Sequence, residues 1–222
     1  MIIPGTLVPA TQYKSQLESL LHTSNTHRFF GAQPISFDSS HLQLLKSTSF
    51  FCSEKADGIR VLFYTVTVFN SQNKPSALTF LIDRKNDYYQ LPLGLPHPTE
   101  PRFLQHTCLD GELVHDVRDG KQVLYFLAFD CLLYEGASLC DKPYTKRLGK
   151  LRQCVLDPYL KREYQDQRYR ESLPFRIRLK RLHLSYHLPK VFNEISQNKH
   201  KSDGIIFTAT EAPYTFGTCS TM

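Results

Sequence analysis

Residues 50–69 read FFCSEKADGIRVLFYTVTVF, an apolar and β-rich run with a charged centre. Two strand-like halves, Phe50–Ser53 and Arg60–Phe69, flank an Asp57-Gly58 pair, which is a strong signal for a hairpin turn. We therefore predict that this stretch folds as a hairpin. Its charged side chains would then lie at the end of a sheet whose other side chains are mostly buried in the core.

Lys55 is the candidate nucleophile of this stretch. Its apolar neighbours, such as Phe50 and Val61, are expected to desolvate the side chain partly, which together with neighbouring cations favours the neutral amine. Such an amine can attack phosphorus or a carbonyl carbon. Gly58 lets the backbone approach a ligand closely, and Arg60 offers a planar fork of donors. The spacing suits a nucleotide, and a hairpin with a solvated turn lysine is the alternative.

The composition favours an anionic partner. The 222 residues suit one large domain or one and a half small ones, and the formal net charge is +6. A basic chain of this kind fits nucleic acid, nucleotide or phosphorylated protein. The chain has neither a secretory signal nor a bilayer-spanning apolar run, so we expect no membrane partner. Six widely spaced cysteines without a CxxC pair argue against zinc and for reduced, buried thiols inside the cell.

Several local patterns predict individual elements. The expected helices are Thr11–Leu21, His41–Lys46, Lys190–Asn198 and one from Pro143 onward that Asp141 caps. The expected strands are Ala77–Asp83, after a polar loop at Ser71–Ser76, and the pair Thr107–His115 and Lys121–Asp130 around a turn at Asp119-Gly120.

Two of these segments are rich in basic residues. Arg147, Lys150 and Arg152 are expected on a solvated helix face. Phe175–Leu182 alternates apolar and basic residues, which predicts a half-buried strand with one cationic face. That face is a candidate surface for RNA or for a phosphorylated polymerase tail, and a solvated strand face is the alternative.

Four stretches resemble, in the same order, the motifs of the covalent nucleotidyltransferases, the superfamily of mRNA capping guanylyltransferases and polynucleotide ligases. They are KADGIR (55–60), LDGELV (109–114), YFLAFDCLLYEG (125–136) and HKSDGIIFT (200–208). Four further stretches resemble the capping branch, and its fungal members most closely: RFFGAQPISF (28–37), FLIDRKNDYYQLP (80–92), PFRIRLKRLHLSY (174–186) and APYTFGT (212–218). The resemblance covers almost the whole chain.

This resemblance implies an α+β fold. The expected architecture is a nucleotidyltransferase domain of the DNA ligase and mRNA capping enzyme type, similar to ATP-grasp, with antiparallel sheets, flanking helices and a nucleotide cleft between them. Residues 1–222 are predicted to be one such domain, incomplete at its C-terminus. The family pattern continues with a lysine-rich motif and an OB domain, and both are expected to be absent from this chain.

The resemblance also implies an activity. An mRNA guanylyltransferase takes GMP from GTP as a covalent lysyl-GMP intermediate and passes it to the 5′-diphosphate end of RNA, with Mg or Mn as divalent cation. The implied location is the nucleus, and the implied partners are GTP, the RNA 5′ end, an RNA 5′-triphosphatase subunit and the phosphorylated RNA polymerase II tail. The alternatives are an ATP-dependent RNA or DNA ligase and a non-catalytic module that binds RNA or the phosphorylated tail.

The resemblance assigns roles residue by residue. Lys55 is the catalytic residue, and the nucleotide-binding residues are Arg60, Arg84, Asp110, Gly111, Glu112, Phe129, Lys201 and Asp203. The metal candidates are Glu112, which can also accept from a ribose hydroxyl, and Asp203. Phe129 would stack on the purine, and Lys201 would place a point charge against the α-phosphate. Each role has a structural alternative, such as a core phenylalanine or an acid paired with an arginine.

Overall fold

Two β-sheets organise the chain in the computed structural model, which describes residues 2–23, 29–69, 72, 74–118, 120–198 and 200–219. The large sheet has the order β1-β6-β5-β4-β7-β8-β10, with β9 paired to β8. Its strands are β1 (Thr6–Val8), β4 (Ile59–Phe69), β5 (Pro75–Ile82), β6 (Tyr88–Leu91), β7 (Thr107–Arg118), β8 (Lys121–Tyr134), β9 (Ala137–Ser138) and β10 (Arg176–Leu179). All its described pairings are antiparallel except that of β10 with β8.

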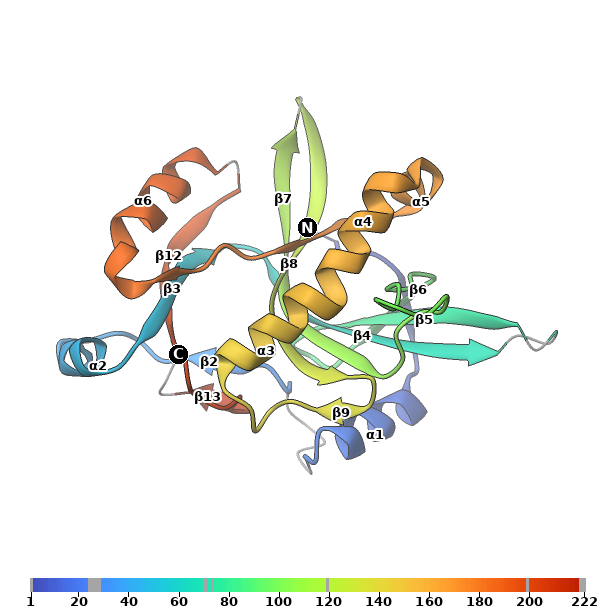
Figure 1. Ribbon diagram of the computed structural model, residues 1–222, viewed down its shortest axis with the longest axis horizontal. Coiled ribbons are helices and arrows are strands. Elements are labelled where there is room, and N and C mark those ends of the chain that lie inside the picture. Colours follow the sequence, from blue (N-terminus) through green and yellow to red (C-terminus); the bar gives the residue numbers. More distant parts are fainter. Residues whose placement is uncertain are drawn as a thin grey trace.

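The small sheet has the order β11-β3-β12, and β13 pairs with β2 beside it. Its strands are β3 (Phe50–Ala56), β11 (His183–Leu184) and β12 (Ser202–Ala209), and the separate pair is β2 (Ala32–Pro34) with β13 (Gly217–Cys219). Figure 1 shows this sheet with the helix α6 on one side of the molecule and the large sheet on the other.

Helices cover the sheets. They are α1 (Thr11–Leu20), α2 (His41–Ser47), α3 (Tyr144–Lys150), a π-helical segment (Leu151–Leu156), α4 (Asp157–Gln165), α5 (Gln167–Ser172), a 3-10 turn (Ser185–His187) and α6 (Leu188–Gln197). The continuous run from α3 to α4 crosses one face of the large sheet, and α1 lies on the other side (Figure 1). None of the described helices has the length and apolar character that crossing a membrane requires.

The strand β4 is apolar on both faces because both faces are covered. Val61 and Phe63 pack into the cluster that contains Leu151 of the α3–α4 run, whereas Leu62 and Tyr64 pack with α1. A strand buried on both sides reads as a continuous apolar run rather than an alternating one.

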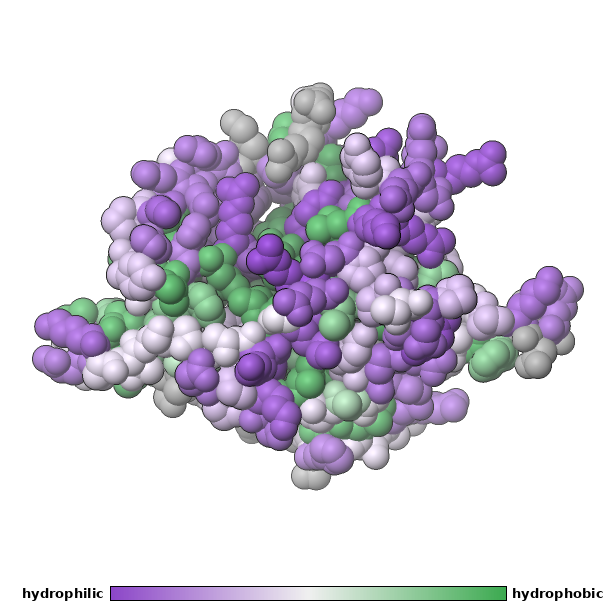
Figure 2. All heavy atoms as spheres, in the orientation of Figure 1, coloured by the Kyte–Doolittle hydropathy of each residue, from purple (hydrophilic) through white to green (hydrophobic). Residues whose placement is uncertain are grey.

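Hydrophilic residues cover most of the face of the molecule that Figure 2 shows, and hydrophobic residues gather near the hollowed centre of that face.

Several predicted elements are confirmed. The helices near Thr11, His41 and Lys190 and the strand from Ala77 are present, and β7 and β8 form the predicted hairpin with Arg118 opposite Lys121. Of the residues named in predicted loops and motifs, Arg28, Ser71, Asn73 and Asp119 lie outside the described residues.

The predicted hairpin at Asp57-Gly58 is wrong. β3 pairs with β11 and β12 in the small sheet, whereas β4 pairs with β5 and β7 in the large one. The two strands therefore do not pair, and Asp57-Gly58 carries the chain from one sheet to the other. An Asp-Gly pair indicates that the chain turns, but it does not determine which strands pair with β4 on its two edges.

The predicted solvated helix face is also wrong at Arg147. Asp141 does not cap α3, which starts after Pro143, and its carboxylate pairs instead with Lys142. Arg147 is 2% exposed and donates from Nε and Nη2 to the two carboxylate oxygens of Asp130, at 2.8 and 2.9 Å. Arg152 is exposed, as predicted.

The cationic face predicted for Phe175–Leu182 is mostly neutralised. The regular strand is only β10, and Arg176 and Arg178 both donate to the buried carboxylate of Glu163 on α4. Lys180, just beyond β10, is buried rather than solvated. Within the described residues, this segment therefore presents fewer unpaired charges than its sequence indicates.

Replacing Arg147 by methionine should destabilise the protein by about 3–5 kcal/mol, because Asp130 would remain buried without its partner. Arg152→Met, on the same helical run but exposed, should change the free energy of unfolding by less than about 0.5 kcal/mol. Urea unfolding of both variants measures the difference. Equal stabilities would show that the Arg147–Asp130 pair does not support the fold.

Candidate active site

A groove of about 400 Å³ opens where the two sheets meet. Its lining includes five of the predicted site residues, namely Lys55, Arg60, Arg84, Glu112 and Asp203. They come from the end of β3, the start of β4, the turn after β5, the middle of β7 and the start of β12. The sequence motifs therefore converge in space although up to 148 positions separate them.

Lys55 and Asp203 form an ion pair across the two paired strands of the small sheet. The distance from Lys55 Nζ to Asp203 Oδ2 is 2.5 Å, and the side chains are 43% and 53% exposed. The hydrogen bond from Lys55 lowers the pKa of Asp203. The side chain of Lys55 is thus partly covered, and Phe50 lines an adjoining cavity with it, while its ammonium lies at the open groove and faces a carboxylate.

Gly58 brings the start of β4 against β7. An added Cβ would lie 2.2 Å from the carbonyl oxygen of Leu113, so no larger residue fits. Its backbone N–H donates to Glu112 Oε1 at 3.1 Å. The close approach that Gly58 permits is thus to the β7 backbone, and it fixes the carboxylate of Glu112 at the groove.

Glu112 lies partly buried in the groove wall. Burial raises the pKa of its carboxyl group, although the cation of Lys180 and the Gly58 N–H act in the opposite direction. Its carboxylate still has capacity to accept further hydrogen bonds, because each oxygen carries two lone pairs.

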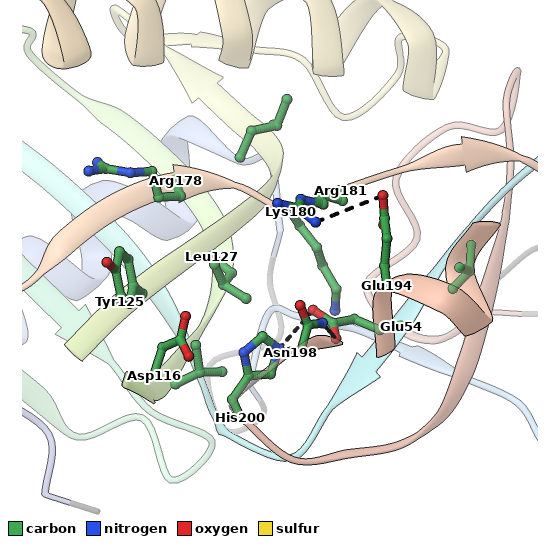
Figure 3. A pocket seen from close by; sticks show the side chains of 13 residues that line it. Glu54, Asp116, Tyr125, Leu127, Arg178, Lys180, Arg181, Glu194, Asn198 and His200 are labelled. Atoms are coloured by element: carbon green, nitrogen blue, oxygen red, sulfur yellow. Dashed lines mark hydrogen bonds and ion pairs between the residues drawn. The ribbon is translucent and has the colours of Figure 1, made fainter. Parts of the chain in front are cut away.

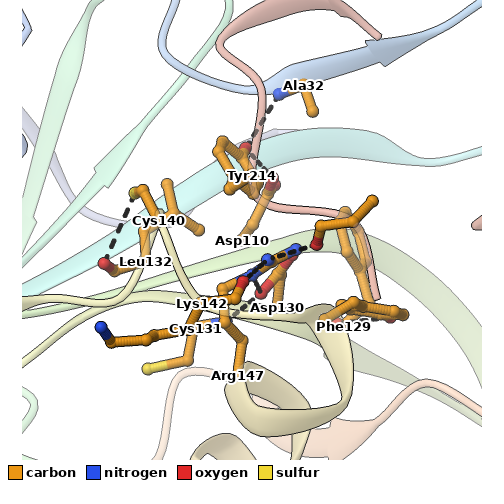
Figure 4. Close-up of polar contacts among 12 residues, drawn as sticks. Ala32, Asp110, Phe129, Asp130, Cys131, Leu132, Cys140, Lys142, Arg147 and Tyr214 are labelled. Atoms are coloured by element: carbon orange, nitrogen blue, oxygen red, sulfur yellow. Dashed lines mark hydrogen bonds and ion pairs between the residues drawn. The ribbon is translucent and has the colours of Figure 1, made fainter. Parts of the chain in front are cut away.

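Arg60 is held from behind by a buried network. Its guanidinium donates to both oxygens of Asp110, at 2.9 and 2.6 Å, and to the carbonyl of Ala32 at 2.5 Å. Burial lowers the pKa of Arg60, but the charge of Asp110 and its hydrogen bonds outweigh this effect and raise it. Asp110 also accepts from the hydroxyl of Tyr214 at 2.5 Å, as Figure 4 shows.

Asp110 and Gly111 lie behind the groove rather than in it. Asp110 is fully buried, and both its oxygens are engaged by Arg60. A Cβ on Gly111 would lie 2.3 Å from the ring of Phe126, so this glycine allows core packing. Neither residue lines the groove, and Asp110 holds the guanidinium of Arg60, which does.

Phe129 lies between two cations. Its ring centroid is 5.1 Å from Arg60 Cζ and 5.3 Å from Lys180 Nζ, and its side chain is partly exposed. It lines a small cavity of about 30 Å³ together with Ser53, Ile206 and Thr208 of the small sheet. This volume is large enough for one water molecule but not for a purine ring. A purine ring would enter only if the sheets moved apart.

Lys180 is the candidate site residue that the sequence analysis missed. It is 3% exposed, and its Nζ lies 4.0 Å from Glu112 Oε2. Burial lowers its pKa, although Glu112 and Glu54 act against this effect. A lysine buried with only a long ion pair is rare unless it serves a site. In the sequence, Lys180 stands at the end of a stretch that alternates apolar and basic residues. That alternation predicted a solvent-exposed side chain, so nothing in the sequence indicated a buried lysine.

Arg84 and Lys201 differ in their relation to the groove. Arg84 is exposed in the turn that follows β5, lines the groove, and makes no hydrogen bond to the described residues. Lys201 accepts the backbone N–H of Asp57 with its carbonyl oxygen at 2.9 Å. Its exposed side chain is not part of the groove lining.

The two metal candidates suit a metal ion that is held partly by the protein and partly by the phosphates of a substrate, rather than by the protein alone. Glu112 and Asp203 both line the groove, but the described residues hold no group of three or more His, Cys, Asp or Glu side chains that could bind a metal. Mg²⁺ is commonly held by one or two carboxylates together with the phosphates of a substrate. Two carboxylates in one groove suit that arrangement.

Comparison with known families gives a match over nearly the whole chain. The family model described as mRNA capping enzyme, catalytic domain, matches residues 2–222. The mRNA-capping enzyme subunit alpha of Schizosaccharomyces pombe is 38% identical over 228 residues, covering 97% of this chain and 55% of that protein. The protein of the same name from Saccharomyces cerevisiae is 34% identical over 233 residues, covering 97% and 50%. The chain thus spans about half the length of these curated relatives.

Solved structures show the same fold. The ATP-dependent DNA ligase from bacteriophage T7, in complex with ATP, matches with a TM-score of 0.52 and 14% sequence identity, covering 86% of this chain and 67% of that one. The likeness confirms the α+β nucleotidyltransferase fold that the motifs predict.

Gly58→Ala should disturb the junction of the two sheets, because the new Cβ would collide with the Leu113 carbonyl. We expect a loss of at least about 1–3 kcal/mol, typical of a forced backbone shift. Gly149→Ala is the matched control, since its Cβ would meet nothing within 4 Å in α3 and alanine favours a helix. Thermal unfolding of the two variants should therefore shift in opposite directions. A harmless Gly58→Ala would contradict the close packing.

Proposed function

The chain belongs to the family of mRNA capping enzyme catalytic domains, and on this premise we propose that it is a GTP:RNA guanylyltransferase that forms a covalent lysyl-GMP intermediate. The observation that carries the proposal is the pairing of Lys55 with Asp203 in a groove that also presents Arg60, Arg84 and Glu112. The groove thus combines an amine that can act as the nucleophile with arginine side chains that can donate hydrogen bonds to an anionic nucleotide.

The first step takes place at Lys55. After its ammonium leaves Asp203 and gives a proton to solvent water, the amine attacks the α-phosphorus of GTP, an N–P bond forms, and the bond to the leaving pyrophosphate breaks. In-line geometry and charge neutralisation supply most of the catalysis in phosphoryl transfer. The ion pair keeps Nζ at the position where the α-phosphate arrives.

The other residues bind and orient the nucleotide. We assign the exposed guanidinium of Arg84 to phosphate or ribose oxygens, and Glu112 to a ribose hydroxyl. Arg60 is fixed by Asp110, so its remaining N–H groups face the groove with little freedom. Asp110 and Gly111 then act through their neighbours. Lys201 would need to turn toward the groove to reach a phosphate.

A divalent cation fits the same groove. Asp203 and Glu112 would hold Mg or Mn together with the phosphates, and the ion would offset the negative charge that develops on the α-phosphate.

The base is proposed to bind between Phe129 and Ile206, one from each sheet. Phe129 offers an aromatic face for stacking. Lys180 lies beside that ring as a buried donor, and among the described residues its ion-pair partner is Glu112 at 4.0 Å. Its ammonium suits the carbonyl oxygen at position 6 of guanine, whereas adenine presents an amino group there. This contact would favour GTP over ATP.

The second step and the partners follow from the family. The lysyl-GMP would pass its GMP to the 5′-diphosphate end of RNA, which releases Lys55 and makes the cap. This role implies a nuclear location, and contacts with an RNA 5′-triphosphatase subunit and with the phosphorylated RNA polymerase II tail are part of the proposal.

Incubation with α-labelled GTP and a divalent cation should give a labelled protein band on a denaturing gel, and Lys55→Met should abolish it. Lys46→Met, an exposed lysine on α2, should label normally. A chelator should remove the signal from the unmodified protein. Labelling by ATP in place of GTP would favour a ligase, and labelling of Lys55→Met would refute the assignment of the nucleophile.

Lys180→Met should reduce the preference for GTP over ATP about 10- to 100-fold, the range expected for a lost hydrogen bond from a charged donor. Methionine fills a similar volume without a buried charge, and Glu112, 4.0 Å away, keeps the Gly58 N–H as its partner. Arg178→Met is the control, because that side chain pairs with Glu163. Label yields from competing GTP and ATP measure the ratio, and an unchanged ratio in Lys180→Met would exclude this contact.

A further inference from the structure

A second cavity lies on the face of β3 opposite to Lys55. It measures about 230 Å³ and is bounded by β7, β8, the segment after β10 and α6. Because successive side chains of a strand point to opposite faces, Glu54 enters this cavity while Lys55 enters the groove. Figure 3 shows Glu54, Asn198 and His200 gathered at one end of it.

Glu54 is tied to both residues. Its Oε1 lies 2.9 Å from His200 Nε2, and its Oε2 accepts from Asn198 Nδ2 at 2.5 Å. Glu54 and His200 are each only 11% exposed. The hydrogen bond to Glu54 raises the pKa of His200. Burial acts to raise the pKa of Glu54, but His200 and Lys180 outweigh it and lower that pKa. We call Glu54, Asn198 and His200 the Glu54 cluster.

The segment that carries Asp203 has little regular support from the strand ladder. Ser202 pairs with Ala56, but the register then shifts, and regular pairing resumes only at Ile205 opposite Glu54. Gly204 has a φ of +150°, which side-chain-bearing residues rarely adopt. Asp203 therefore lies in a bulge at the point where it must meet Lys55.

The contacts that hold this bulge come from the residues around Lys55. The hydroxyl of Ser202 donates to the carbonyl of Lys55 at 3.0 Å, and the N–H of Asp57 donates to the carbonyl of Lys201 at 2.9 Å. The Glu54 cluster adds the side-chain contacts at its N-terminal end, three residues before Asp203. It joins this end to the residue that directly precedes Lys55.

We propose that the Glu54 cluster positions Asp203 against Lys55, and that Glu54, Asn198 and His200 are thereby positioning residues for nucleotidyl transfer. The inference rests on the proposed function of Lys55. None of the three lines the groove, so they act through the backbone of residues 200–203 and not on the nucleotide. Their loss would move Asp203, and a displacement of about 1 Å at a reacting group can cost up to about 100-fold in rate.

The decisive variants are His200→Ala and His200→Gln. Alanine removes the donor to Glu54, whereas the glutamine amide can still donate to it. We expect His200→Ala to slow formation of the labelled protein about tenfold at saturating GTP. KM for GTP should change less than twofold, and His200→Gln should recover most of the rate. A merely structural role would not produce this split or this rescue.

His183 provides a matched control in the same sheet. Its Nε2 lies 3.0 Å from Glu194 Oε1, so it forms a His–Glu pair of the same kind on the opposite edge of β3. His183→Ala removes a comparable contact without touching residues 200–203. It should leave the labelling rate within twofold of the unmodified protein. Equal losses in His183→Ala and His200→Ala would overturn the proposal.

Hydrogen exchange tests the same inference without enzymatic activity. In His200→Ala, the peptides that contain Asp57 and Ser202 should exchange faster, while peptides from β4 and β8 stay unchanged. His183→Ala should not alter the Asp57 peptide. Unchanged exchange in His200→Ala would refute the positioning role even if the protein labels. Faster exchange in an unlabelled protein would retain that role and reject only the proposed chemistry.

Discussion

Two buried carboxylates face each other on neighbouring strands, and the fold depends on a separate arginine for each. Asp110 on β7 lies opposite Asp130 on β8, and both are almost fully inaccessible to solvent. Burial and the charge of Asp110 raise the pKa of Asp130, in spite of Arg147. Unpaired charges here would cost several kcal/mol each. Arg60 of β4 donates to Asp110, and Arg147 of α3 donates to Asp130. The two ion pairs therefore attach β4 and α3 to the neighbouring strands β7 and β8.

This network also holds the C-terminal segment. Tyr214 donates to Asp110, accepts from the N–H of Ala32, and lies under Arg147, which donates to the carbonyl of Ala212 (Figure 4). The contacts run from the segment after β12 to the guanidinium of Arg60 at the groove. The guanidinium of Arg60 is thus held in place by buried hydrogen bonds. The phosphate end of the proposed site, with exposed Lys55, Asp203 and Arg84, is open.

The site exists because the chain changes sheets at Asp57-Gly58. Lys55 and Asp203 belong to the small sheet, whereas Arg60, Glu112 and Phe129 belong to the large one. Gly58 allows the two to meet, since its lack of a side chain lets β4 lie against β7. The small cavity at Phe129 requires the sheets to separate for a base to enter. The contact between the two sheets at Gly58 therefore lies beside both the groove that contains Lys55 and the small cavity at Phe129.

The sequence alone determined the family, the order of the motifs, the longest strands and several helices, and the convergence of Lys55, Arg60, Arg84, Glu112 and Asp203 that the motifs imply. These follow from local patterns and from residue types that one chemistry requires. Only the tertiary structure decided that β3 and β4 lie in different sheets, that Arg147 and Lys180 are buried, and that Asp110 serves Arg60. Pairing of strand edges and matching of buried charges are set between residues distant in the chain, and no local pattern records which partner a strand or a cation will meet.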